Sequence, residues 1–517
     1  MSNKIVFICG SSRHEFKFAG KCNMHELLLE SGIKFDFPCG GKKTCGKCRI
    51  KIISGLEFIS EPDETEKKFL SDKEIRQNIR YACMCEVFGD VVIELNPENK
   101  IEVQTSGLNS AGIIPDRFEN FGAENVYGAA VDIGTTTVAV YLYDMITGNC
   151  LGIATEENPQ RAYGADVITR INYTIENKDG LENLKNLILS LVFKLIKNLC
   201  EENNISQNDV YNVVLTGNTV MQHIAMGLPP KTIAFAPFTP VSLFGFDVTA
   251  KETGITGINE NAVIYFPPAF ASYVGGDIAT GIIASDTDLS DKLRIFLDIG
   301  TNGEIGLGDK NSLVFCATAA GPAFEGAHIK FGMAGTKGAI NKIYLGESNN
   351  IIYETIGGIE PKGICGSGII DAVAVMLELE ALGETGRINE DFYITPDIYI
   401  TQNDVTEIQL AKASICAGII TLLHYTGKSI ADIDELVLAG GFGAHINKKS
   451  ACRIGLIPKE LEDKIIVAGN TAGMGAAAVL LDSSAVERIN KVAGNSKYIE
   501  LSGDDFFEDE YVEQMMF

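Results

Sequence analysis

Basic residues are scarce in this chain of 517 residues. Lysine and arginine together number 43 against 68 aspartates and glutamates, which gives a formal net charge of -25 at pH 7. Such a charge repels a polyphosphate backbone, and no basic run offers the patch that would release counterions from nucleic acid. We therefore do not expect nucleic acid as a partner.

Long hydrophobic runs are also missing. The N-terminal stretch MSNKIVFICGSSRHEF contains only four consecutive apolar residues before polar ones, too few for a signal-peptide core, and no later run reads as long enough to span a bilayer. We expect a cytoplasmic protein without a membrane partner. The composition, 46% hydrophobic and 21% charged, is that of a globular protein, and the length predicts two or three domains.

The sequence has 13 cysteines, an odd number, spread largely through apolar segments. In a long chain without an export signal this does not indicate a disulfide framework, and most of them are expected to be buried free thiols. A group near the N-terminus is the exception.

Residues 1–97 are predicted to form a small mixed sheet with helices. Four short runs alternate apolar and polar side chains and predict strands: KIVFICG, HEFKFAG, RIKIISG and DVVIEL. Helices are predicted over Met24 to Glu30 and over Ser71 to Arg80, where Ser71 and Glu74 form a capping-box pattern. The acidic run from Glu61 to Glu66 is expected to be a solvated helix face.

The loop FPCGGKKTCGKCRI has the spacing C-x5-C-x2-C, with glycines that let its backbone curl around one point. Cys39, Cys45 and Cys48 would need a fourth, remote ligand, either Cys83 or Cys85. Three close cysteines and one remote one are typical of plant-type [2Fe-2S] ferredoxins, whose usual first gap is four residues. Cys83 is favoured because its segment resembles the one that carries the last ligand in related ferredoxin modules. A zinc site or unliganded thiols are the alternatives.

Residues 98–126 are rich in Gly, Asn, Ser and Pro and predict a linker. Strand and helix patterns then alternate, which indicates an α/β architecture. Two similar units follow, over 127–290 and 291–482, and a C-terminal tail over 483–517. Between the equivalent points of the two units lie 82 positions, Asp132 to Val214, and 139 positions, Asp298 to Val437, so the second copy carries about 57 extra residues.

Each unit opens with a near-identical peptide, VDIGTTTVAV or LDIGTNGEIGL. A strand that ends in Asp-Ile-Gly-Thr places a carboxylate beside a turn whose amides and hydroxyls can hold phosphate oxygens. Two facing turns could grip a triphosphate, with Asp132 and Asp298 orienting Mg²⁺ directly or through its waters. The expected phosphate-binding residues are Gly134, Thr135, Thr136 and Thr137 in the first turn and Gly300, Thr301, Asn302 and Gly303 in the second.

Two further glycine motifs complete the predicted nucleotide site. VLAGGFGA offers a surface for close approach of adenine or ribose at Gly440, Gly441, Phe442 and Gly443. Gly366 and Ser367 would add unpaired amides at a helix start. Either Glu304 or Glu325 could position water at the γ-phosphate, and each could equally be a structural hydrogen-bond acceptor. Singly, these motifs carry little weight, but their order along the chain favours nucleotide binding.

These motifs resemble those of the acetate and sugar kinase, Hsp70 and actin superfamily, whose ATPase fold is a duplicated ribonuclease H-like α/β domain. Joined to an N-terminal, β-grasp-like ferredoxin domain and to GNTVMQHIAMG, AAGPAFEGAHI and GICGSGIID, they resemble the reductive activators of corrinoid-dependent methyltransferases of anaerobic metabolism. The resemblance implies that one electron passes from the [2Fe-2S] cluster to an inactive Co(II) corrinoid protein, restoring Co(I), in an ATP-dependent reaction. An upstream electron donor is also implied, and a homodimer stays open.

Two other functions remain alternatives at this point. One is a small-molecule kinase in which the cluster only senses redox state. The other is a ferredoxin-type electron carrier whose second domain is a non-catalytic scaffold; the intact Asp132 and Asp298 argue against it.

Overall fold

The computed structural model describes residues 2–9, 12–33, 35, 37, 39–70, 72–95, 115–118, 122–443 and 445–517. These fall into two compact units, one within 1–99 and 159–181 and the other within 100–158 and 182–517. Most of the predicted linker, 98–126, lies outside the described residues.

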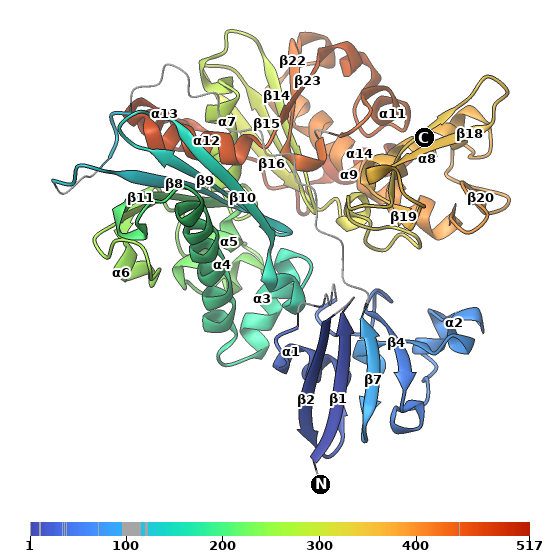
Figure 1. Ribbon diagram of the computed structural model, residues 1–517. Helices are drawn as coiled ribbons and strands as arrows, with labels where there is room; N and C mark the ends of the chain where they lie inside the picture. Colours follow the sequence, from blue (N-terminus) through green and yellow to red (C-terminus); the bar gives the residue numbers. More distant parts are fainter. Residues whose placement is uncertain are drawn as a thin grey trace. The chain divides into compact units, whose positions relative to one another are not determined.

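The N-terminal unit is built on a mixed five-stranded sheet in the order β2-β1-β7-β4-β5 (Figure 1). Its strands are β1 (Ser2–Cys9), β2 (Ser12–Ala19), β4 (Arg49–Ser54), β5 (Ile79–Tyr81) and β7 (Val91–Leu95). β1 and β7 run parallel and the other pairs are antiparallel. Helix α1 (Met24–Glu30) buries Met24, Leu27 and Leu28 in the core of this unit. The four strands and the first helix expected from the sequence are all present.

The second helix expected in this unit is wrong over its C-terminal part. Helix α2 covers only Asp72–Arg76, and Arg80 lies in β5, which pairs with β4.

The expectation that the acidic run is solvated is wrong for Glu66. This residue is fully buried and accepts hydrogen bonds from Arg80 Nε at 2.9 Å and from Arg80 Nη2 at 2.6 Å. The Tyr81 amide donates to the same carboxylate at 2.9 Å. This contact, 15 residues away in sequence, favours strand over helix at Arg80.

The second unit contains two six-stranded sheets, of which five strands in each have the same topology (Figure 1). The sixth strands differ, since β12 pairs antiparallel with β13 and β24 pairs parallel with β16. The first has the order β10-β9-β8-β11-β13-β12 and the second β23-β22-β14-β15-β16-β24. The first-lobe strands are β8 (Tyr127–Ile133), β9 (Thr137–Asp144), β10 (Cys150–Glu157), β11 (Val210–Gly217), β12 (Phe246–Thr249) and β13 (Val263–Phe266). The second-lobe strands are β14 (Arg294–Ile299), β15 (Gly303–Gly308), β16 (Leu313–Thr318), β22 (Glu435–Ala439), β23 (Ile465–Gly469) and β24 (Lys497–Tyr498).

Strand register confirms the internal duplication. Val214 of β11 lies beside Ala130, two residues before Asp132, and Val437 of β22 lies beside Phe296, two residues before Asp298. The second copy contains additional small sheets between β16 and β22. They are formed by β17 (Ala339–Leu345), β18 (Ile351–Thr355) and β19 (Gly363–Ile364), and by β20 (Phe392–Tyr393) and β21 (Tyr399–Ile400).

Helices cover both sheets. The longer ones are α4 (Gly180–Glu202), α5 (Thr219–Met226), α7 (Gly276–Ala284), α8 (Gly366–Glu378), α9 (Gln402–Thr426) and α12 (Thr471–Leu481). The short helices of this unit include α6 (Ala250–Thr253), α10 (Gly440–Gly443) and α11 (Lys448–Arg453). The first unit also contains the paired strands β3 (Cys22–Asn23) and β6 (Glu86–Val87) and the helix α3 (Val167–Glu176). The helices expected near 181–200, 367–382 and 410–424 are present, although α9 begins eight residues earlier than expected.

Helix α12 follows strand β23 of the second sheet in sequence but shares the hydrophobic core of the first sheet, together with α7. The helices approach closely, because a Cβ atom on Gly475 would lie 1.9 Å from the Thr280 carbonyl oxygen. Only glycine fits at this crossing. The crossing therefore ties the two lobes of the unit together.

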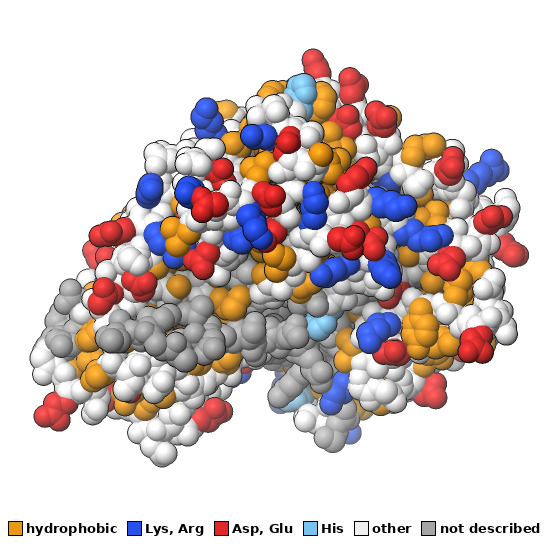
Figure 2. All heavy atoms as spheres, turned by 90° about the horizontal axis from the view of Figure 1, so that it is seen from above, with side chains coloured by type: hydrophobic (Ala, Val, Ile, Leu, Met, Phe, Trp, Pro, Cys, Tyr) orange, Lys and Arg blue, Asp and Glu red, His pale blue; other side chains and the backbone are white. Residues whose placement is uncertain are grey.

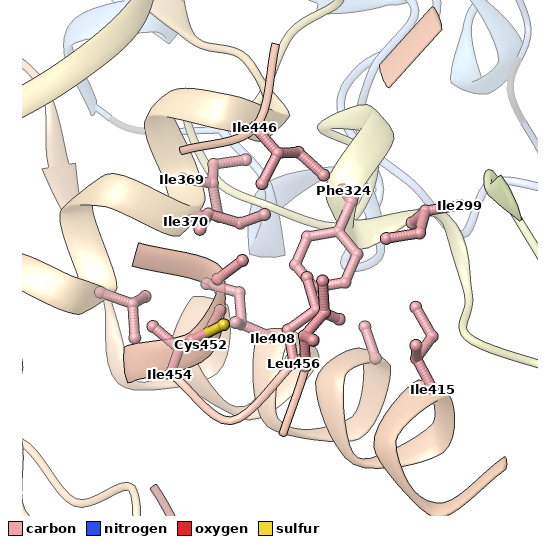
Figure 3. Packing of buried hydrophobic residues seen from close by; sticks show 14 of the residues in the cluster. Ile299, Phe324, Ile369, Ile370, Ile408, Ile415, Ile446, Cys452, Ile454 and Leu456 are labelled. Atoms are coloured by element: carbon pink, nitrogen blue, oxygen red, sulfur yellow. The ribbon is translucent and has the colours of Figure 1, made fainter. Parts of the chain in front are cut away.

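One described helix, α9, is long and apolar enough to cross a membrane by length and composition, which was not expected from the sequence. Most of its apolar stretch is buried within the fold. Figure 3 shows two of its residues, Ile408 and Ile415, in the second-lobe core beside Phe324. Burial of this kind is typical of a core helix. On the face seen in Figure 2, acidic and basic side chains are interspersed, without a single basic patch.

Residues 483–517, expected from the sequence to be a separate tail, form α13 (Ser483–Asn495), β24 and α14 (Asp505–Glu513). β24 pairs parallel with β16, and α14 packs on α9. The segment is therefore part of the second unit.

Candidate functional site

Four cysteine thiols come together in the N-terminal unit. The Cys48 and Cys83 sulfurs are 3.3 Å apart, and the Cys83 amide donates to the Cys48 sulfur at 3.4 Å. Cys39 is in hydrogen-bonding contact with Cys45 and Cys83; these contacts lower the pKa of the Cys39 thiol and raise the pKa of the other two. The structure thus brings together the four cysteines that the sequence favoured as ligands.

The cysteine loop depends on glycine at three positions. Gly40, Gly41 and Gly46 have φ of 58°, 78° and 58°, in the left-handed region that glycine adopts without strain. A Cβ atom would lie 2.6 Å from the His25 ring at Gly41 and 2.6 Å from the Phe69 ring at Gly46. The loop therefore curls against α1 and Phe69, which turns its sulfurs to one point.

Cys83 reaches this point through a single turn of 3₁₀ helix, Ala82–Met84, whose first amide donates to the Cys48 carbonyl at 2.8 Å. Cys85, the alternative ligand, is fully buried in the core, and burial raises the pKa of its thiol to about 12. Four convergent sulfurs, two of them partly exposed, fit the ligand set of an iron-sulfur cluster.

In the second unit, the two Asp-Gly-Thr turns lie at corresponding ends of β8 and β14. Burial is the main cause that raises the pKa of Asp132 to about 6 and the pKa of Asp298 to about 7. The charge of Asp132 contributes to the raised pKa of Asp298, so the two carboxyls share one environment. Asn470, the N-cap of α12, donates to Asp132 Oδ2 at 3.0 Å and to the Tyr141 hydroxyl at 3.2 Å.

A third aspartate, which was not predicted from the sequence, belongs to the same group. Asp277 lies in the first turn of α7; burial and then the charges of Asp298 and Asp132 raise its pKa to about 8. Burial, followed by the charges of Asp277 and Asp298, also raises the pKa of Glu304 well above its usual range. In the sequence, Asp277 follows two glycines at the start of a helix. A single motif of this kind does not by itself identify a residue of a binding site.

Side-chain amides fix the first turn. Asn158 Nδ2 donates to the Gly134 carbonyl at 2.9 Å, and Asn218 Nδ2 donates to the Thr135 hydroxyl at 3.1 Å. Thr137 closes the turn, since its carbonyl accepts the Gly134 amide at 3.0 Å. In the second turn, the Gly300 amide donates to the Asn302 carbonyl at 2.8 Å, and Gly303 begins β15. The second turn is thus one residue shorter than the first, since four residues separate Ile133 from its partner Val138 and three separate Ile299 from its partner Gly303.

The glycine motif after β22 lies directly beside the second aspartate. Gly440 has φ of 81°, and a Cβ atom there would be 2.3 Å from Asp298 Oδ1, whereas a Cβ on Gly441 would meet open space. At Gly443 it would approach the Leu438 side chain at 2.9 Å. Gly441 therefore presents bare backbone to solvent, the surface that a planar ligand needs.

Gly366, at the start of α8, packs against the same motif. A Cβ atom there would lie 2.4 Å from the Phe442 ring, which stacks on Phe324 with centroids 5.8 Å apart. The buried Ser367 hydroxyl donates to the Asn341 carbonyl at 2.9 Å. That hydroxyl is thus engaged within the fold, and Gly366, Ser367 and Gly368 are all buried, so the role of this helix start in ligand binding stays a prediction.

Glu325 connects the two turns. Its carboxylate accepts hydrogen bonds from Thr136 Oγ1 at 3.1 Å and from Thr301 Oγ1. One residue thereby contacts both predicted phosphate sites.

Comparison with known proteins identifies the domains that contain these residues. Residues 6–88 match a 2Fe-2S iron-sulfur cluster binding domain, 127–290 the RACo middle region, and 292–517 the C-terminal domain of RACo, the ASKHA domain. The chain is 30% identical, over 95% of its length and 95% of the relative, to the corrinoid activation enzyme RamQ of Eubacterium limosum. The chain belongs to the RACo family.

Two further relatives support this membership. A solved structure of a reductive activator for corrinoid, iron-sulfur protein is 31% identical, with a TM-score of 0.69 over 99% of this chain and 98% of that one. The [Co(II) methylated amine-specific corrinoid protein] reductase of Methanosarcina barkeri is 24% identical over 71% of this chain and 72% of its own. The expected combination of an N-terminal ferredoxin domain and an ASKHA ATPase domain is thus confirmed, and all four convergent cysteines of this RACo-family chain lie within the matched ferredoxin domain.

Proposed function

We propose that this protein is an ATP-dependent reductive activator, which passes one electron to the Co(II) centre of a corrinoid protein and restores Co(I). The observation that supports it most directly is the presence, in one chain of this family, of a four-sulfur centre and of a site where two phosphate turns share half-buried carboxylates.

Cys39, Cys45, Cys48 and Cys83 would hold the [2Fe-2S] cluster, which supplies reversible storage of a single electron. The sulfurs converge, Cys48 and Cys83 are buried, and Cys39 and Cys45 are partly exposed. Partial exposure on one side gives an electron a short route to a docked partner. An upstream electron donor could use the same side.

The carboxylates Asp132 and Asp298 would orient Mg²⁺ on the nucleotide, and Asp277 joins them. Burial raises the pKa of all three carboxyls and so disfavours their ionised forms, whereas a divalent cation favours the ionised forms. The residues therefore fit a cation. Threonine hydroxyls of the two turns would donate to phosphate oxygens, and Gly440 to Gly443 would pack against adenosine.

Coupling to ATP has a thermodynamic reason. Plant-type clusters have potentials of roughly -400 mV, and for one electron each tenfold of unfavourable equilibrium corresponds to about 59 mV. The resemblance implies that the Co(II)/Co(I) couple is harder to reduce than the cluster. Because a ligand shifts two states only by its differential affinity, the nucleotide must contact both lobes, as Asp132 and Asp298 allow.

The test measures whether the rate of ATP hydrolysis depends on the presence of a corrinoid protein. Anaerobically purified, reconstituted protein should hydrolyse ATP faster when a Co(II) corrinoid protein is added, and Asp298→Ala should abolish both hydrolysis and activation. Hydrolysis that responds to a small metabolite instead would favour a kinase. A protein that binds no Mg-ATP would favour an electron carrier with a scaffold domain.

A further inference from the structure

Glu325 is a carboxylate placed where phosphate donors converge. Thr136 belongs to the first lobe and Thr301 to the second, and both hydroxyls donate to Glu325, the former to Oε2 at 3.1 Å and the latter to Oε1. A hydroxyl has one proton to donate. Neither threonine can therefore donate to a phosphate oxygen while it donates to Glu325.

The backbone that carries Glu325 is anchored. Its neighbour Phe324 is 2% exposed and lies in the second-lobe core among Ile369, Ile370 and Ile446 (Figure 3). The 3₁₀ turn Pro322–Glu325 is bounded by Gly321 and Gly326, both at positive φ. Glu325 itself is only half-buried. Its side chain can therefore rotate while the turn stays in place.

Charge makes the two ligands exclusive. A carboxylate at the hydroxyls repels an incoming triphosphate, in a site that already contains Asp132, Asp277 and Asp298. We propose that Glu325 competes with the terminal phosphate of ATP for the hydroxyls of Thr136 and Thr301, and is a positioning residue rather than the base that activates water. This inference rests on the proposed function, since it requires that the site take ATP.

ATP can therefore bind fully only when it displaces the Glu325 carboxylate, which links the two lobes. Once Glu325 is displaced, the two threonine hydroxyls, one from each lobe, can donate to a single phosphate group. The nucleotide then replaces an internal link between the lobes by one of its own. A nucleoside diphosphate lacks the terminal phosphate and leaves Glu325 where it is, so the residue discriminates ATP from ADP.

The experiment measures the Kd of a non-hydrolysable ATP analogue and of ADP, both with Mg²⁺, by calorimetry on the full-length protein. Glu325→Gln keeps an acceptor of the same size but removes the charge. We expect this substitution to lower the Kd of the ATP analogue roughly tenfold, which corresponds to the free energy of one charged hydrogen bond. The Kd of ADP should change by less than about twofold. Glu347→Gln, on an exposed turn of the same lobe, is the matched control.

Each outcome decides between the roles of Glu325. Unchanged affinity for the ATP analogue in Glu325→Gln, with hydrolysis lost, would overturn the inference and make Glu325 the base, while the proposed function stands. Equal tightening of ATP and ADP would also overturn it. If neither wild type nor Glu325→Gln binds the analogue, the proposed function fails as well; binding by Glu325→Gln alone would support the competition. Thr301→Val removes a hydroxyl donor from both the Glu325 carboxylate and the terminal phosphate, and it should weaken ATP binding.

Discussion

Three half-buried aspartates, Asp132, Asp277 and Asp298, destabilise the fold when they are ionised without a cation. Burial raises their pKa values to about 6, 8 and 7, from an ordinary value of 3.8. Each carboxyl therefore binds its proton more tightly in the folded than in the unfolded protein. The free energy of unfolding must then fall as pH rises from about 4 to about 8, at a rate of up to about 1.4 kcal/mol per pH unit for each carboxyl.

We expect the melting temperature measured without nucleotide to fall as the pH is raised from about 5.5 to about 8.5, and Asp298→Asn to make this fall shallower. Mg-ATP should stabilise the wild type more at about pH 8 than at about pH 6, because the cation needs ionised carboxylates. Thermal unfolding followed by circular dichroism measures both effects. An Asp298→Asn variant with the wild-type pH slope would show that Asp298 does not titrate in this range.

The choice between Cys83 and Cys85 is decided by a matched pair of variants. The Cys83 sulfur lies 3.3 Å from that of Cys48, whereas Cys85 is buried in the core. After anaerobic reconstitution, Cys83→Ala should lose most of its iron and visible absorbance, and Cys85→Ala should retain both. The reverse result would move the fourth ligand to Cys85.

Substitution of the glycines of the short helix α10 should have different effects on stability and on Mg-ATP binding, depending on which glycine is changed. Gly440→Ala places a methyl group against Asp298 in a backbone conformation that alanine resists, so we expect a loss of about 2 to 4 kcal/mol in stability. Gly441→Ala meets open space and should fold normally, but its methyl group should weaken Mg-ATP binding at the proposed adenosine surface. Chemical denaturation and calorimetry separate these effects. Full ATP affinity in Gly441→Ala would remove this surface from the site.

Strand β5 is held by a buried ion pair. Glu66→Gln would leave the buried Arg80 guanidinium without its anion, which typically costs about 3 to 5 kcal/mol. Glu64→Gln, on an exposed side chain of the same acidic run, should leave unfolding unchanged. Urea denaturation monitored by loss of cluster absorbance compares them. Equal midpoints for the two variants would show that the pair is dispensable.

The sequence predicts helices and strands correctly where the local pattern of apolar residues determines the conformation. It fails where a contact with a residue distant in sequence determines it. The alternation in β4 and β7 reflects one buried face, and a sequence shows that directly. The error at Arg80 arose because a helical pattern was read without its contact to Glu66. The apolar pattern of α9 predicts too short a helix because its first turn is polar, although Thr401 caps that turn and Asp404 is buried.

For the whole molecule, the two repeated peptides were enough to predict the duplication, and strand register places Val214 and Val437 at the equivalent positions that the sequence predicts. The carboxylate site was predicted only in part. Asp277 and Asn470 reach Asp132 from elements far away in sequence, and neither stands in a motif that identifies its partner. The Glu325 bridge likewise needed the structure, because Thr136 lies 189 positions away.

The central claim is that one chain uses ATP to drive an electron onto a corrinoid protein. Reduced protein and a Co(II) corrinoid protein should be mixed without oxygen while cobalt absorbance is recorded, with Mg-ATP, with Mg-ADP and with neither. We expect the Co(I) spectrum to accumulate only with Mg-ATP and wild type, and not with Asp298→Ala or Cys83→Ala. Co(I) that forms equally without nucleotide, or that never forms with any Co(II) corrinoid protein of this organism, would contradict the claim.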